Sequence, residues 1–276
     1  MRLFILNYFP KNVIRCLRYF KSKIYKQNIE LKVEFSRIRN IPRFTNGTTD
    51  LFTDLLYFID SASFLFMYDE IFKKEIYRFE TNSKNPYIID CGANIGLSVI
   101  YFKKLFPKSI ILAFEPDKNV FNILQTNVNS FNLSDVTLIN KGCWNEETEL
   151  IFYNEGADGG RITNSNDFDK VSIIKTTRLR GYLAKQIDFL KIDIEGAETK
   201  VLEDCEDLLI NVKNLFVEYH SFSDKNQTLS LILQILSNSG FRYQVQSVGV
   251  FSPHPFLSIN SYSGMDLQLN IFAFRN

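Results

Sequence analysis

The sequence contains little histidine and little cysteine. Only two histidines, His220 and His254, occur in 276 residues. The cysteines form no Cys-x-x-Cys pair, and no two of them lie close in the sequence; they are Cys16, Cys91, Cys143 and Cys205. This spacing argues against a structural zinc site and against a disulfide framework, so we expect reduced thiols and a cytoplasmic protein.

Long apolar runs are also missing. No stretch of 18 apolar residues occurs, so the sequence predicts no transmembrane helix. The first residues are apolar and basic, but Asn7, Pro10 and Lys11 interrupt them and no small-residue cleavage site follows. We therefore do not predict a signal peptide.

The chain has almost no net charge, but its charge is unevenly distributed. Residues 1–29 hold seven Lys or Arg residues and no acid, so the net charge of +1 leaves −6 for the remainder. An acidic body argues against a nucleic-acid partner. The basic stretch predicts an amphipathic helix over 10–26, with an apolar stripe of Val13, Leu17, Phe20 and Ile24. Two interpretations stay open, packing on the main domain or contact with the inner face of the membrane through residues 1–26.

A strand, a glycine turn and a helix are predicted around residues 85–106. Tyr87–Ile89 is a short apolar run that suits a buried parallel strand, and it is followed by Asp90. Gly92 and Gly96 permit a sharp turn, and apolar residues then recur at helical spacing from Ile95. Such a unit binds nucleotide-like ligands at the carboxyl edge of a sheet.

This turn does not match a pyrophosphate site. A dinucleotide fingerprint needs a glycine where this chain has Asn94, and an NAD-linked oxidoreductase is therefore disfavoured. The carboxylate of Asp90 beside the turn would repel a phosphate. It favours a cationic ligand such as S-adenosylmethionine, which carries a sulfonium and an ammonium group.

Further βα units follow at regular spacing and predict a doubly wound, mostly parallel sheet. Ser109–Phe114 is the second strand, and it is followed by Glu115 and Pro116. An acid about 20 residues after the glycine turn suits hydrogen bonds from ribose hydroxyls, and Pro116 stiffens the turn. Val136–Asn140 is the third strand.

The predicted domain organisation has two parts. Residues 1–83 form a helical N-terminal segment, with a loop over 40–50, a helical pattern from Leu51 and Asp50 as its N-cap. Residues 84–276 form the main domain. A β insertion over 145–180 interrupts it and contains a predicted lid around Gly156–Gly160.

A second polar cluster is predicted at the end of a central strand. Ile187–Gly196 reads Ile-Asp-Phe-Leu-Lys-Ile-Asp-Ile-Glu-Gly, which places Asp193 and Glu195 at the carboxyl edge of the sheet. His220 follows the fifth strand at the same edge, and histidine titrates near neutral pH. A structural Lys191–Asp193 ion pair and a structural His220 are the alternatives.

The motifs together resemble the FkbM family of S-adenosylmethionine-dependent methyltransferases over about residues 85–247. They are Asp-x-Gly-Ala-Asn-Ile-Gly at 90–96, Phe-Glu-Pro at 114–116, Asp-Phe-Leu-Lys-Ile-Asp-Ile-Glu-Gly-Ala-Glu at 188–198 and Glu-Tyr-His at 218–220. The resemblance implies a Rossmann-like α/β fold with a seven-stranded, mostly parallel sheet whose last strand is antiparallel. The cofactor residues it implies are Asp90, Gly92, Asn94, Gly96, Glu115, Pro116, Gly142, Cys143 and Asp193.

The implied reaction is methyl transfer to a hydroxyl of a sugar, glycan or natural product. Such a reaction needs alignment of donor and acceptor, and a base for the hydroxyl proton. We predict His220 as this base, assisted by Asp193 or Glu195, and no metal. A divalent cation at the two carboxylates is the alternative. An RNA methyltransferase and a non-catalytic cofactor-binding protein are the other candidate functions.

Overall fold

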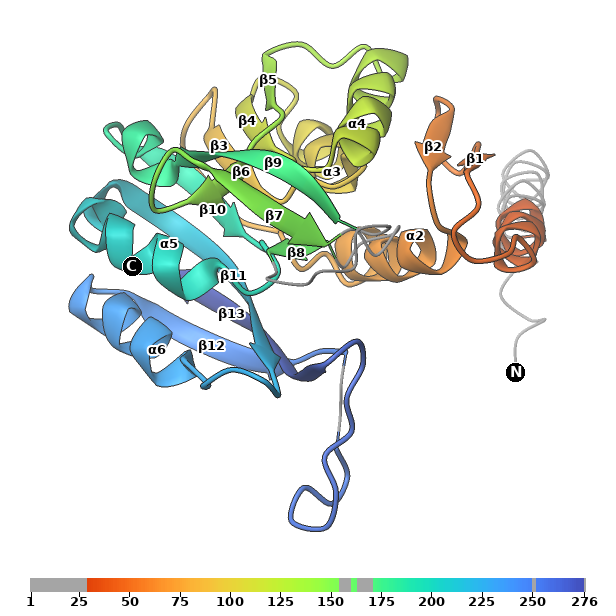
Figure 1. The fold of residues 1–276 in the computed structure, drawn as a ribbon. Helices are drawn as coiled ribbons and strands as arrows, with labels where there is room; N and C mark the ends of the chain where they lie inside the picture. Colours follow the sequence, from red (N-terminus) through yellow and green to blue (C-terminus); the bar gives the residue numbers. More distant parts are fainter. Residues whose placement is uncertain (1–28, 154–159, 163–170, 250–251, 276) are drawn as a thin grey trace, which may run out of the picture.

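The computed structural model describes residues 29–153, 160–162, 171–249 and 252–275 (Figure 1). The predicted basic helix over 10–26 lies outside the described residues. The predicted lid also lies outside them, apart from Gly160.

A seven-stranded sheet forms the centre of the fold, in the order β12-β13-β11-β10-β3-β4-β5. Parallel pairs join the five strands from β11 to β5 in this order, and β13 is antiparallel to both of its neighbours, β11 and β12. This confirms the predicted sheet. The strands are β3 (Tyr87–Cys91), β4 (Ile110–Phe114), β5 (Val136–Ile139), β10 (Ile187–Ile192), β11 (Val212–Phe222), β12 (Arg242–Ser247) and β13 (Met265–Phe274).

Helices cover both faces of this sheet (Figure 1). One face packs against α3 (Leu97–Leu105) and α4 (Lys118–Ser130), and the other against α5 (Glu198–Cys205) and α6 (Leu229–Asn238). Every residue of the central strand β10 is buried. The continuous apolar runs of the central strands follow from this double coverage.

The N-terminal segment is only partly helical, and this corrects the prediction for 40–80. Residues 29–39 form a helix, and a small antiparallel hairpin of β1 (Gly47–Thr49) and β2 (Leu56–Phe58) follows. Next come α2 (Ser61–Tyr68) and a π-helical turn, Asp69–Lys73. Leu56 and Phe58 are buried at alternate positions, so this apolar pattern has the strand period.

Asp60, rather than the predicted Asp50, caps the first helix of this region. Its carboxylate accepts a 2.8 Å hydrogen bond from the backbone N–H of Ser63 and a second from the side chain of Arg43. Asp50 precedes a bend of the chain, where no helix begins. Apolar residues of this segment, such as Phe64 and Tyr77, share one core cluster with α3 and α4.

The segment predicted as a β insertion over 145–180 forms a small sheet, and its first strand already begins at Gly142. It forms a four-stranded sheet in the order β6-β9-β7-β8. Its strands are β6 (Gly142–Trp144), β7 (Glu149–Tyr153), β8 (Arg161–Ile162) and β9 (Val171–Arg178). Gly142 and Cys143 therefore belong to this insertion. Because β6 directly follows β5, the insertion lies at the same end of the main sheet as the predicted site.

Two remaining expectations concern cysteines and membrane spans. Cys91, Cys143 and Cys205, the cysteines among the described residues, are buried and free. None of the helices in the described part of the chain has the length and apolar character needed to cross a membrane.

Candidate active site

The turn between β3 and α3 is held in an unusual backbone conformation. Gly92 and Gly96 have φ angles of +88° and +94°, and Asn94 has a φ of +48°. The N–H groups of Gly92 and Ala93 both donate to the carbonyl oxygen of Phe114, at the end of β4. A side chain on Gly92 would lie 1.9 Å from the carbonyl oxygen of Asp193. Glycine is therefore required here both for its φ and for close contact between the two loops.

Gly96 has a different role in the structure. It is the N-cap residue of α3, and a Cβ at this position would lie 2.7 Å from the side chain of Leu124 on α4. Its conformation thus allows close packing of the two helices. Its predicted cofactor contact stays a prediction.

Asp90 lies at the base of the turn and is fully buried. Its Oδ2 accepts a 2.5 Å hydrogen bond from Ser98, and its Oδ1 has no hydrogen-bond partner although Lys191 Nζ lies 3.4 Å away. A buried carboxylate oxygen without a hydrogen bond can accept one from a bound donor group.

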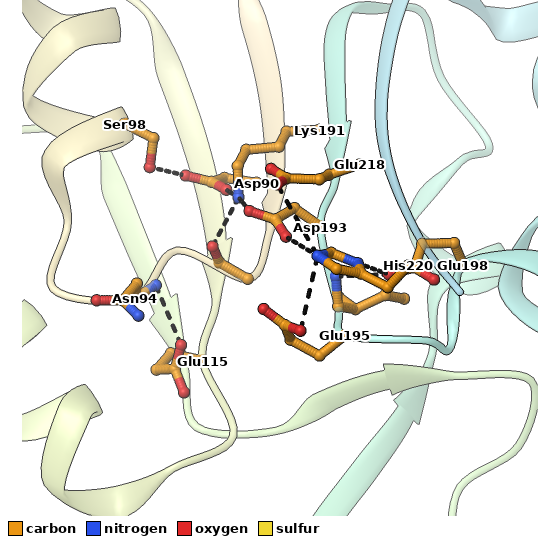
Figure 2. A network of polar contacts seen from close by, with 12 residues as sticks. Asp90, Asn94, Ser98, Glu115, Lys191, Asp193, Glu195, Glu198, Glu218 and His220 are labelled. Atoms are coloured by element: carbon orange, nitrogen blue, oxygen red, sulfur yellow. Dashed lines mark hydrogen bonds and ion pairs between the residues drawn. The ribbon is translucent and has the colours of Figure 1, made fainter. Parts of the chain in front are cut away.

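Glu115 is buried at the end of β4 and points back at the turn (Figure 2). One carboxylate oxygen accepts a 3.0 Å hydrogen bond from the N–H of Asn94, and the other a 2.9 Å hydrogen bond from the N–H of Asp117. Burial raises the pKa of Glu115 to about 8, because the charged form loses hydration. The side chain thus combines a fixed orientation with unused acceptor capacity.

Lys191 connects the turn with the second polar cluster. Its ammonium group lies 3.0 Å from a carboxylate oxygen of Asp193 and 3.4 Å from one of Asp90, and only 3% of the side chain is exposed. Burial lowers the pKa of Lys191, but the two carboxylates outweigh this effect and hold the pKa well above its usual value. The Lys191–Asp193 ion pair, which was an alternative interpretation of the sequence, is therefore present.

Four side chains from the loop after β10 and from the neighbouring strand β11 form what we call the acidic cluster: Asp193, Glu195, Glu218 and His220. The three carboxylates point toward the imidazole (Figure 2). Their nearest oxygens lie 4.0, 3.6 and 3.9 Å from His220 Nε2, in that order. The sequence prediction that Asp193, Glu195 and His220 gather at one sheet edge is thus met by the structure, while their catalytic role stays a prediction.

Glu198 orients the imidazole from the opposite side. Its Oε1 lies 2.9 Å from His220 Nδ1 and also accepts hydrogen bonds from the N–H groups of Ile194 and Gly196. Nδ1 is therefore the nitrogen that donates to Glu198, and Nε2 faces the acidic cluster. Glu195 itself has a φ of +55°, a conformation that costs about 1 kcal/mol or more in a non-glycine residue.

The electrostatics of the cluster are strongly coupled. Burial, followed by the nearby charge of Asp193, raises the pKa of Glu218 to about 8. Burial also raises the pKa of Glu195. Burial lowers the pKa of His220, but Glu195 and Glu198 outweigh it and raise that pKa well above its usual value. Glu195 and Glu218 thus keep their protons to a higher pH than exposed carboxyl groups do, and a bound cation would favour their ionised forms.

The turn and the acidic cluster face one cavity of about 590 Å³. Seven residues of the predicted cofactor set, one of them Asp193 of the acidic cluster, line it together with two further members of that cluster: Gly92, Asn94, Glu115, Pro116, Gly142, Cys143, Asp193, Glu195 and Glu218. Asp90, Gly96 and His220 are not among the described residues that line this cavity. The imidazole therefore lies behind the carboxylates.

The other walls come from parts of the chain that the motifs do not cover. Phe44, Phe66, Met67 and Tyr77 belong to the N-terminal segment, Phe152 and Ile174 to the β insertion, and Gln268 and Asn270 to β13. These remaining walls of the cavity are thus built from three separate segments. The shape of the cavity depends on all of them.

Sequence reasoning assigned no role to Glu218 or Glu198. Glu218 precedes His220 by two residues in a strand, so both side chains lie on the same face. This period-two relationship was the available signal. Glu198 offered none, because its carboxylate reaches His220 from the first turn of α5.

The sheet order, with β13 inserted antiparallel between β11 and β12, and a cavity at the carboxyl edge define a class I methyltransferase fold. The profile of the Methyltransferase FkbM domain matches residues 90–243. This match covers more than half of the chain, and the chain belongs to the FkbM methyltransferase family.

Three curated relatives agree with this assignment. Methyltransferase 1 of Beauveria bassiana is 26% identical over 66% of this chain and 82% of its own length. Methyltransferase sdnD of Sordaria araneosa is 30% identical over 59% of this chain and 77% of its own length. The 2-O-methyltransferase NoeI of Sinorhizobium fredii is 24% identical over 49% of this chain and 63% of its own length. The protein is thus a methyltransferase.

Proposed function

We propose that this methyltransferase uses S-adenosylmethionine and transfers its methyl group to a hydroxyl of a sugar, glycan or natural product. The observation that carries the proposal is a single cavity with two unlike ends. One end has the glycine turn with Glu115, and the other has the carboxylates of the acidic cluster. The name of the relative NoeI, a 2-O-methyltransferase, supports oxygen as the acceptor atom.

The residues of the first end fit this cofactor chemically. S-adenosylmethionine has an ammonium group, a sulfonium group and a ribose diol, and it has no phosphate. The Glu115 carboxylate lines the cavity and has acceptor capacity for ribose hydroxyls. A cavity of about 590 Å³ lies in the size range of small-molecule sites.

When bound, the cofactor supplies an activated methyl group on a positively charged sulfur. The chain's own task is to align the acceptor oxygen with that methyl group and to exclude water from the reacting atoms. A hydroxyl must also lose its proton as it attacks. Asp193, Glu195 and Glu218 line the cavity, so we propose that the proton leaves through one of these carboxylates.

The sequence predicts His220 as the base, but its imidazole does not line the cavity. Its ring is held by Glu198 at Nδ1, while Nε2 faces Asp193 and Glu195. In this proposal His220, held by Glu198, positions the carboxylates that line the cavity, and one of these carboxylates takes the proton.

Binding and labelling experiments test the proposal separately. Calorimetry with S-adenosylmethionine and with S-adenosylhomocysteine should show one site per chain, and Asp90→Asn should weaken it. Incubation of cell fractions with methyl-labelled cofactor should then label a hydroxyl-bearing small molecule or glycan. Glu203→Gln, which removes an exposed carboxylate on α5, is the matched control and should leave both results unchanged.

The outcomes that would contradict the proposal are distinct. If neither ligand binds, S-adenosylmethionine is not the cofactor. If the label appears on RNA or on a nitrogen atom, the acceptor is not a hydroxyl of a sugar, glycan or natural product. His220→Ala should abolish labelling while it spares cofactor binding. Full activity in that variant would show that His220 has no role in the reaction.

A further inference from the structure

We infer that the acidic cluster is a binding site for one divalent transition-metal cation, with Asp193, Glu195 and His220 as its protein ligands. Nothing in the family relationship assigns a metal to this chain. The inference concerns the same cavity as the proposed function. It stands on the geometry of the cluster alone.

The spacing of the cluster fits a shared ion better than direct hydrogen bonds. The oxygens of Asp193 and Glu195 lie 4.0 and 3.6 Å from His220 Nε2, beyond hydrogen-bond distance. Two ligand atoms that are each about 2.1 Å from one ion lie about 3 to 4.2 Å apart, according to the angle between them. One ligand atom from each of the three residues lies within 4.8 Å of the others. Both carboxylates are partly exposed to the cavity and can rotate to close the remaining gap.

His220 provides the second, independent observation. Its side chain is completely buried, and Nε2 has no hydrogen-bond partner. An orphaned ring nitrogen is costly in a protein interior unless it has a ligand. Its other nitrogen is held by the carboxylate of Glu198 at 2.9 Å, which is the arrangement that orients metal-binding histidines.

A cation at this position would also stabilise the carboxylates around the ring. Glu195, Glu218, Asp193 and Glu198 all face His220 within 4.0 Å. Lys191 is the other cation near them, and it is paired with Asp193 and Asp90 and bonded to a backbone carbonyl. Glu195 and Glu218 thus have no lysine or arginine partner among the described residues. A divalent cation at Nε2 would compensate for the negative charge of both ionised carboxylates.

The ligand set indicates which metals fit. One imidazole nitrogen with two carboxylates suits Mn²⁺, Fe²⁺ or Zn²⁺ better than Ca²⁺, which prefers oxygen ligands alone. His220 would contact the ion from the protein side, while Asp193 and Glu195 line the cavity. The remaining coordination positions would therefore face the cavity, where the acceptor is expected.

The consequence for the reaction rests on the proposed function. A hydroxyl oxygen bound to the ion would lose its proton more readily, because the dication stabilises the negative charge on that oxygen. The proton would go to Glu218, and the oxygen would form its new bond to the methyl carbon while the sulfur keeps the electron pair of the broken bond. His220 would then be a ligand and could not act as the base.

Titration with Mn²⁺ alone tests the site without cofactor or acceptor. The full chain, stripped with EDTA and dialysed, should bind one Mn²⁺ per chain in calorimetry and in electron paramagnetic resonance of free Mn²⁺. His220→Gln and Glu195→Gln should each weaken the affinity by about tenfold or more. Glu203→Gln should bind as the wild type does. Absence of saturable binding, or unchanged affinity in both ligand variants, would overturn the inference.

A measurement on the wild-type protein keeps the test valid if the variants fail to fold. Pulsed electron paramagnetic resonance of the Mn²⁺ complex should show coupling to one imidazole nitrogen, and its absence would remove His220 as a ligand. Binding of S-adenosylhomocysteine measured in EDTA tests the proposed function independently. Loss of one result with retention of the other therefore identifies which of the two ideas is wrong.

Discussion

The ammonium group of Lys191 donates a 2.7 Å hydrogen bond to the backbone carbonyl oxygen of Gly92. Lys191 lies on β10 and Gly92 in the turn after β3, so one buried side chain joins the two neighbouring strands at the carboxyl edge. The same ammonium group pairs with Asp90 below the turn and with Asp193 in the acidic cluster. The Lys191 side chain therefore connects the two ends of the cavity through a hydrogen bond and two ion pairs.

Replacement of Lys191 by Met should be strongly destabilising. The change leaves Asp90 and Asp193 without their cation in a buried position, and loss of one partner of a buried ion pair costs about 3–5 kcal/mol. Urea denaturation should show this loss in the free energy of unfolding. Lys73→Met is the control, because Lys73 pairs with Asp69 on the surface and such pairs contribute under about 1 kcal/mol. Equal effects of the two substitutions would contradict the role of Lys191.

Gly92→Ala should disrupt the turn itself. The new methyl group would lie 1.9 Å from the Asp193 carbonyl oxygen, and alanine disfavours a φ of +88°. Together these effects should cost at least about 2 kcal/mol of folding free energy and weaken cofactor binding. Gly181→Ala is the matched control, since no atom lies within 4 Å of its added Cβ, and thermal unfolding should detect no change there beyond about 0.5 kcal/mol.

Glu115 should make cofactor affinity depend on pH. Its carboxyl has a pKa of about 8 in the folded protein, and the ionised form is the better acceptor for ribose hydroxyls. Affinity for S-adenosylhomocysteine should therefore rise by up to about 30-fold between pH 6.5 and 9. Glu115→Gln should bind more weakly and lose this part of the pH dependence, while titration of the ligand's own amine remains in both profiles. Parallel calorimetric profiles for the two proteins would refute this role.

The same residue should affect stability in the opposite direction. Its folded pKa of about 8 lies above the ordinary value of 4.5. The stability associated with the neutral carboxyl is therefore present below about pH 4.5 and is lost as the pH rises through about 8. The free energy of unfolding of the wild type should fall relative to that of Glu115→Gln between pH 5 and 9, which urea denaturation at each pH can measure.

We propose that residues 1–26 attach the protein to an anionic membrane surface. This stretch lies outside the described residues, and the proposal rests on its basic, amphipathic sequence. Deletion of 1–26 should reduce sedimentation with vesicles that contain phosphatidylserine, and should leave the affinity for S-adenosylhomocysteine intact. Added salt should weaken the wild-type binding, because screening reduces the attraction. Unchanged sedimentation after the deletion would argue for packing on the main domain instead.

The sequence predicted the main sheet well because its strands carry strong local signals. Runs such as Ile187–Ile192 are apolar throughout, and glycines mark the turn at Gly92. The N-terminal segment was predicted less well. Residues 51–59 have an apolar spacing that fits a helix as well as a strand, and only packing against α4 selects the strand β2.

The sequence by itself determined the order of the βα units and which polar residues follow the strands, because both depend on local composition and period. It also determined that Asp193 and His220 would share the carboxyl edge. Only the tertiary structure decided what these residues face. The partner of a buried side chain is set by strand neighbours and loops distant in sequence, as for Glu198 behind His220, Lys191 beneath Gly92 and Gln268 beside Glu218. For this reason the imidazole lies behind the carboxylates instead of on the cavity wall.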